Sequence, residues 1–160
     1  MSPRFAPVLL LLALACSGGQ SASGPAPAAR GKATAPDAAV RNFMQAVADS
    51  NIAGMSQVWG TKNGPAAKTR QPADWEQRLG ITQLFLRRTP YRITGIEEVR
   101  DLPDRRVVQV ELTRTDVQGA TCIKRLPVTV VETREYGWLV VGLDLTVAGT
   151  PGRACAPPAP

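Results

Sequence analysis

The stretch "RRVVQVELTR", Arg105–Arg114, alternates apolar and polar residues through its centre. Its apolar members share one face of an extended chain: Val108, Val110 and Leu112. The polar residues between them fall on the opposite face. A period of two over this length predicts a β-strand with one face against a core and the other toward solvent.

Three neighbouring segments also read as strands, and short turns join them in succession. They are "YRITGIEEV" (91–99), "TCIKRLPVTVVET" (121–133) and "GWLVVGLDLTV" (137–147). Gly95 predicts a bulge in the first of them. Pro127 lacks a backbone N–H and predicts an edge position or a bulge in the second. Short turns favour hairpins, so the sequence predicts a four-stranded antiparallel sheet.

Upstream of residue 90 the apolar period lengthens to that of a helix. Asp37 is a good N-cap, and one apolar face follows it: Val40, Phe43, Met44 and Val47. A short second helix is expected at 52–59. A third is expected to begin at Pro72 and to stop at Thr89–Pro90, with Arg87 and Arg88 in its last turn. The Gly- and Pro-broken stretch 60–71 reads as a loop.

This order of elements predicts an α+β fold. Three N-terminal helices would pack on one face of a curved, cone-like four-stranded antiparallel sheet. The expected domain covers residues 37–148. It is followed by a proline-rich tail, 149–160, which carries Cys155.

The N-terminus reads as an export signal. Residues 1–15 hold one basic residue, Arg4, and the apolar run "FAPVLLLLALA". That run is too short to span a bilayer, which takes about 20 residues. Ala13-Leu14-Ala15 fits the A-x-A pattern of secretory cleavage, and cleavage there without an anchor would give a secreted or periplasmic protein.

Cys16, directly after this signal, resembles the acylated cysteine of bacterial lipoproteins. Small residues flank it, with Ala15 before and Ser17 after, although Ala13 stands where that family usually has leucine. The resemblance implies a lipid anchor in the bacterial cell envelope, on the periplasmic face of the outer membrane. Residues 16–36, rich in Ser, Gly, Ala and Pro, would then form a disordered tether with a reach of about 25 Å.

The chain holds three cysteines. If Cys16 is acylated, Cys122 and Cys155 remain as a pair, and an exported protein favours a disulfide. A final hairpin that places Val130 opposite Val140 would bring Cys122 near Ala148, within reach of Cys155. The alternative is a buried reduced Cys122 and a loose Cys155.

Three segments carry a wider resemblance: "AAVRNFMQAVADSNIAGMSQVWG", "YRITGIEEV" and "GWLVVGLDL". In order and apolar placement they resemble the nuclear-transport-factor-2-like superfamily, the cone-shaped fold of ketosteroid isomerases and polyketide cyclases. The resemblance covers roughly residues 37–147. It implies a space between helices and sheet that holds a ligand, an active site or only packed side chains.

Composition argues against several classes of site. The chain has no histidine, its acids show no calcium-loop spacing, and "GTKNGP" lacks the P-loop pattern. We therefore expect no metal and no cofactor. The net charge of +6 is spread among interleaved acids and bases, without a basic run, so nucleic-acid binding is not expected.

Five side chains are candidates to line a pocket in such a cone: Trp59, Trp75, Tyr91, Trp138 and Asp144. In an enzyme, Asp144 would be the general base and Tyr91 a hydrogen-bond donor, as the resemblance implies. For each of them a structural role is the competing interpretation. Arg78, Arg87 and Arg88 would either form an anion-binding rim or simply face solvent.

The sequence thus favours a lipid-anchored domain that binds a protein partner or a small apolar ligand without catalysis. One alternative is an isomerase- or cyclase-type enzyme that uses a buried acid with a raised pKa. The other is a purely structural domain that acts through its surface.

Overall fold

The computed structural model describes residues 32–155. The predicted signal (1–15), Cys16 and the last five residues lie outside the described residues. The helices are α1 (Pro36–Ala48), α2 (Ile52–Val58), α3 (Ala66–Thr69), α4 (Trp75–Leu86) and α5 (Leu145–Ala148). The strands are β1 (Gly60–Thr61), β2 (Gly64–Pro65), β3 (Tyr91–Glu98), β4 (Arg105–Thr115), β5 (Thr121–Thr133) and β6 (Gly137–Leu143).

The main sheet has the strand order β3-β4-β5-β6, and every neighbouring pair is antiparallel, as predicted. The alternation in β4 is confirmed, since Val108, Val110 and Leu112 are fully buried. The bulge expected at Gly95 is also present, as a register shift between Ile93 and Gly95.

Pro127 sits in β5, which lies between β4 and β6. Even so, the pairing of β6 ends with Leu143 opposite Val128, one residue short of the proline. One side of β5 is therefore unpaired at Pro127, so the missing N–H costs no ladder hydrogen bond there. The predicted edge position is correct locally, although the strand as a whole is internal.

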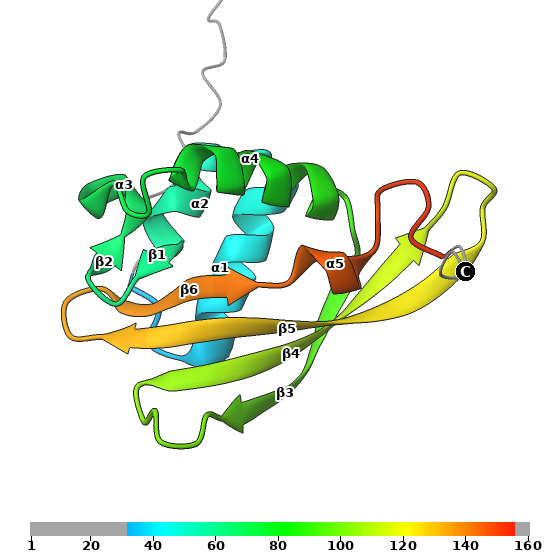
Figure 1. The fold of residues 1–160 in the computed structure, drawn as a ribbon. Helices are drawn as coiled ribbons and strands as arrows, with labels where there is room; N and C mark the ends of the chain where they lie inside the picture. Colours follow the sequence, from blue (N-terminus) through cyan, green and yellow to red (C-terminus); the bar gives the residue numbers. More distant parts are fainter. Residues whose placement is uncertain (1–31, 156–160) are drawn as a thin grey trace, which may run out of the picture.

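The helices lie over one face of the sheet (Figure 1). Side chains from α1, α2 and α4 fill the space between the layers: Phe43, Met55 and Leu79 are at most 1% exposed. These large side chains meet the apolar face of β4 and β5 in one core cluster. The resemblance implied a space between helices and sheet, and in this protein buried apolar side chains occupy the region between these layers.

The helix boundaries differ from the prediction in physically simple ways. Asp37 lies in the first turn of α1 and pairs with Arg41, because Pro36 already occupies a first-turn position. Helix α4 begins at Trp75, after Asp74, instead of at Pro72. It ends at Leu86, so Arg87 and Arg88 follow the helix.

The count of three helices is wrong for residues 32–155, which hold five. Residues 60–71 form the small β1–β2 hairpin and α3 instead of a loop. The last strand stops at Leu143, and the chain turns into α5 (Figure 1). The α+β class with a four-stranded antiparallel sheet stands. No helix among the described residues is long and apolar enough to cross a membrane.

Candidate ligand-binding groove

The turn between β5 and β6 is held by one side chain. The Thr133 hydroxyl donates to the Gly137 carbonyl at 2.9 Å and accepts from the Tyr136 N–H at 2.9 Å. Gly137 has φ +69°, a conformation that other residues adopt at a cost. The hairpin end is therefore fixed, with Tyr136 and Trp138 on either side of the glycine.

The start of the domain lies against this turn. Ala33 bridges to Gly137 in parallel, and the Trp138 N–H donates to the Ala33 carbonyl at 3.0 Å. Lys32 Nζ donates to the Arg134 carbonyl at 2.9 Å. A Cβ at Gly137 would collide with the Ala33 carbonyl. The glycine therefore permits the close approach of the incoming chain.

Two clefts flank the contact between the incoming chain and the turn, and we call them together the Trp138 groove. They share Lys32, Ala33 and Trp138. The first cleft, of about 330 Å³, is also lined by Gln57, Val58, Pro65, Ala67, Lys68, Glu135, Tyr136 and Leu139. The second, of about 590 Å³, is also lined by Thr34, Asp104, Glu132, Thr133, Arg134 and Gly137.

The first cleft combines apolar walls with charged groups, two of them positive (Lys32 and Lys68) and one negative (Glu135). Val58, Pro65 and Leu139 supply aliphatic surface. The Lys68 ammonium lies 5.4 Å from the centroid of the Tyr136 ring, within cation–π range. Such a cleft suits an apolar group that carries a negative charge at its edge.

The second cleft is more polar. Asp104 and Glu132 oppose Arg134 and Lys32 in its lining, so the formal charges balance. The indole of Trp138, 7% exposed, forms part of the wall, and the Arg106 guanidinium carbon lies 5.9 Å from its ring centroid. The two clefts thus offer apolar and polar surface side by side.

Tyr136 keeps its proton at neutral pH. A hydrogen bond with Glu135, then partial burial, raises the pKa of the phenol above its usual value near 10. The O–H of the neutral phenol is engaged by Glu135, so the phenol oxygen is available in the first cleft as an acceptor.

The structure separates the five side chains that the sequence offered as pocket lining. Trp138 lines the groove. Trp59 is 7% exposed and belongs to the core, where it bridges to Val140. Trp75 and Tyr91 are half-buried and pack against the core. Burial raises the pKa of Tyr91 although the charge of Arg41 opposes the shift.

Asp144 caps the N-terminus of α5. Its carboxylate accepts from the Thr146 N–H at 2.9 Å and from the Thr146 hydroxyl at 2.6 Å, and the residue is exposed. These bonds to Thr146 lower the pKa of Asp144. A catalytic base in a cone would have the opposite properties, burial and a raised pKa.

Sequence reasoning missed Lys32, Lys68 and Tyr136. Lys32 was assigned to the tether and Lys68 to a loop, so neither was placed beside the last hairpin. Two glycines in the sequence could have pointed to them, because each marks a place where another segment comes close. A Cβ at Gly64 would press on the Tyr136 ring, and a Cβ at Gly137 would press on Lys32 and Ala33. Close backbone approach marks where distant segments meet.

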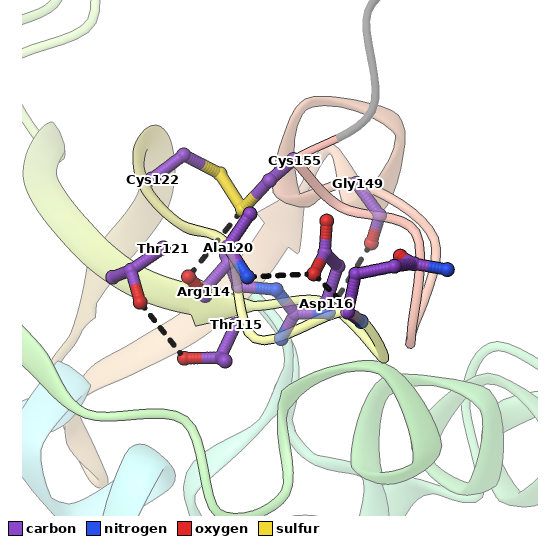
Figure 2. Close-up of a disulfide and its surroundings, with 9 residues drawn as sticks. Arg114, Thr115, Asp116, Ala120, Thr121, Cys122, Gly149 and Cys155 are labelled. Atoms are coloured by element: carbon purple, nitrogen blue, oxygen red, sulfur yellow. Dashed lines mark hydrogen bonds between the residues drawn. A yellow bond between two sulfur atoms is a disulfide. The ribbon is translucent and has the colours of Figure 1, made fainter.

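At the other end of β5, the predicted disulfide between Cys122 and Cys155 is present, with a Cα–Cα distance of 5.6 Å (Figure 2). It ties the tail to the β4–β5 hairpin. In that hairpin the Asp116 carboxylate accepts from the N–H groups of Gln118 and Ala120. Within residues 32–155, no cluster of three or more acidic, cysteine or histidine side chains could hold a metal.

Comparison with known proteins shows no family. No family matches the sequence, and no curated protein does. Among solved structures, a putative calcium/calmodulin dependent protein kinase II association domain from Xanthomonas campestris matches with a TM-score of 0.40 and 17% identity. The match covers 72% of this chain and 92% of that chain. At this TM-score the match carries no inference about function.

Proposed function

We propose that this protein is a lipoprotein of the bacterial envelope that binds an amphipathic ligand in the Trp138 groove without catalysis. Residues 1–15 would be removed, and Cys16 would carry the lipid. The ligand is a small apolar molecule or a side chain of a protein partner, and it bears a negative charge at one end. The observation that carries the proposal is the largely apolar first cleft, whose charged lining has two lysines, Lys32 and Lys68, against one carboxylate, Glu135.

The physical basis is the pairing of two kinds of surface. An apolar group in the first cleft would lose contact with water against Val58, Pro65 and Leu139. An anionic end would meet Lys68 at the cleft and Lys32 at the shared wall. A few polar groups in a mostly apolar cleft give orientation, and the apolar area gives affinity.

The groove lies where the chain enters the domain. Lys32, in its wall, is 16 residues after Cys16 in the sequence. A flexible Ser/Gly/Ala-rich chain of this length has a reach of about 20–24 Å. An anchor at Cys16 would therefore keep the groove near the membrane surface, where amphipathic ligands are concentrated.

The non-catalytic interpretation is preferred because the sequence's one candidate base, Asp144, is an exposed helix cap with a lowered pKa. The enzyme alternative required an inward acid. The purely structural alternative predicts that blocking the groove has no effect on any ligand.

The groove can be tested with 1-anilinonaphthalene-8-sulfonate, an aromatic probe with one negative charge. We expect saturable fluorescence enhancement with the wild-type chain. Ala67→Arg places a long side chain at the first cleft from an exposed position of α3, and it should abolish that enhancement. Ala53→Arg, the same change at an exposed position of α2 outside the groove lining, is the matched control and should keep it. Equal binding by both variants would reject the groove as the site.

The anchor is tested separately by intact mass of protein extracted from membranes. Wild type should begin at Cys16 and carry the mass of a diacylglyceryl group, and Cys16→Ser should leave the membrane fraction. A mature chain that begins at Ser17, or an unmodified Cys16, would reject the lipoprotein proposal and leave the groove result standing.

A further inference from the structure

A second cleft with a different chemistry lies at the opposite end of β5, beside the disulfide. We call it the arginine cleft. Its volume is about 250 Å³, and its charged lining consists of Arg87, Arg88 and Arg114. Thr113 and Thr115 add hydroxyl groups. The cleft is thus lined by three arginines, two from the residues that follow α4 and one from the end of β4.

Arg114 is the fixed member of the set. It is 6% exposed, at the end of the core-facing row of β4. Its Nη1 donates to the Phe85 carbonyl at 2.8 Å and to the Thr89 hydroxyl at 2.6 Å, and its Nη2 donates to the Gly149 carbonyl at 3.3 Å. These bonds use three of the roughly five N–H groups that a guanidinium carries. Arg114 is thus rigid and still has donors to offer.

The charges of this cleft are not neutralised by the described part of the chain. No carboxylate lines it, and no acid among residues 32–155 forms an ion pair with its arginines. Five arginines elsewhere do have such partners: Arg41 with Asp37, Arg78 with Asp74, Arg92 and Arg125 with Glu111, and Arg106 with Glu98. Asp116, two residues after Arg114, is engaged by the hairpin backbone.

We propose that the arginine cleft binds a phosphate group, borne either by a soluble phosphate compound or by a lipid headgroup. Three positive charges without a carboxylate match a dianion better than a single carboxylate does. Guanidinium forks also fit the geometry of phosphate oxygens with paired hydrogen bonds.

Two further observations support this assignment. All of the acceptors of Arg114 are neutral oxygens, so its buried charge is uncompensated, and an anion in the cleft would relieve that cost. Burial indeed lowers the pKa of the Arg114 guanidinium. The backbone of Arg87 and Arg88 follows α4 directly, so their side chains extend from a fixed helix end.

The test uses the full chain in nanodiscs of phosphatidylcholine, titrated with inorganic phosphate. The ¹⁵Nε resonance of Arg114 reports occupancy. We expect a saturable shift in wild type and at least tenfold weaker binding in the double variant Arg87→Gln/Arg88→Gln. The control Arg70→Gln/Arg100→Gln removes the same charge at exposed positions outside the cleft and should bind within twofold of wild type.

Nanodiscs that also contain phosphatidate distinguish the two sources. If the headgroup occupies the cleft, inorganic phosphate binds more weakly in the phosphatidate-containing discs than in discs of phosphatidylcholine alone. In the Arg87→Gln/Arg88→Gln variant this difference in affinity between the two discs should disappear. If the two discs give the same affinity, the ligand is a soluble phosphate. Absence of a saturable shift in wild type, or equal weakening in the control pair, would overturn the proposal.

Discussion

The two ends of β5 hold the two ends of the described chain by different means. At the Thr133 end, the incoming segment is held by backbone hydrogen bonds, by the Trp138 wall and by the close approach that Gly137 permits. At the Cys122 end, the outgoing tail is held by a covalent bond to Cys155 and by the Arg114 guanidinium. Backbone hydrogen bonds and packing secure the first end, and a disulfide with charge-assisted hydrogen bonds from Arg114 secures the second.

This difference accounts for the chemistry of the two clefts. A packed end leaves apolar surface beside it, and this surface forms the first cleft of the Trp138 groove. An end held by a buried arginine leaves uncompensated positive charge, which the arginine cleft presents. The contacts that secure each terminus therefore also contribute to the lining of the adjacent cleft.

The largest effect is expected at the packed end. Trp138→Ala removes a nearly buried indole, and large-to-small core substitutions of this kind cost about 3–5 kcal/mol. Urea unfolding monitored by circular dichroism measures the loss. Trp75→Ala, at a half-buried position, should cost clearly less. An equal loss of unfolding free energy in both variants would mean that Trp138 stabilises the domain no more than a half-buried tryptophan does.

The second effect concerns the covalent end. Removing the disulfide with Cys122→Ser/Cys155→Ser opens a loop whose ends are 33 residues apart. The chain-entropy estimate for a loop of this size is about 3–4 kcal/mol of unfolding free energy. Thermal unfolding of the double variant, with reduced wild type as the comparison, measures it. If reduction leaves the unfolding midpoint unchanged, the tail is held by Arg114 alone.

Several features of the sheet and of the disulfide could be predicted from the sequence. The alternation in β4, the bulge at Gly95 and the pairing of Cys122 with Cys155 all follow from local periodicity, glycine and cysteine parity. The register of Val130 opposite Val140 also matched, because a short turn leaves few alternatives.

The clefts were much less predictable. The Trp138 groove depends on Lys32 and Lys68 meeting the last hairpin, and no periodicity links segments so far apart. The arginine cleft was half visible: Arg87 and Arg88 were suspected as a rim, but Arg114 reads locally as an ordinary strand residue. Arg78, suspected with them, pairs with Asp74 at 2.8 Å instead. That pair is four residues apart in sequence, so its spacing could have been recognised in advance. Among residues 32–155, the absence of a carboxylate beside Arg87, Arg88 and Arg114 depends on tertiary structure and could not.

A third and smaller effect is expected from the hydrogen bonds of Arg114 at the Cys122 end of β5. Arg114→Met keeps a long apolar side chain but leaves the Phe85 and Gly149 carbonyls without their donor. Unpaired buried acceptors cost about 1–3 kcal/mol, and we expect a loss in that range by urea unfolding. Arg92→Met, at an exposed position of β3, should change stability by less. A stability equal to wild type would show that the bonds of Arg114 are dispensable.

The smallest effect is expected at Asp144, which caps α5 between the two ends. Hydrogen bonds to Thr146 lower the pKa of its carboxyl below the ordinary 3.8. A lowered folded-state pKa means that the charged form stabilises the fold. The contribution is therefore present above about pH 4, the ordinary carboxyl range, and is lost as the pH falls through the folded value. Asp144→Ala should thus lower the unfolding midpoint slightly at pH 7. Once the pH is below the folded-state pKa of Asp144, the variant and wild type should have the same midpoint. If the midpoints of variant and wild type still differ by the same amount at low pH, the effect of Asp144 comes from packing and not from its charge. In that case α5 is held by packing, as the Trp138 end partly is.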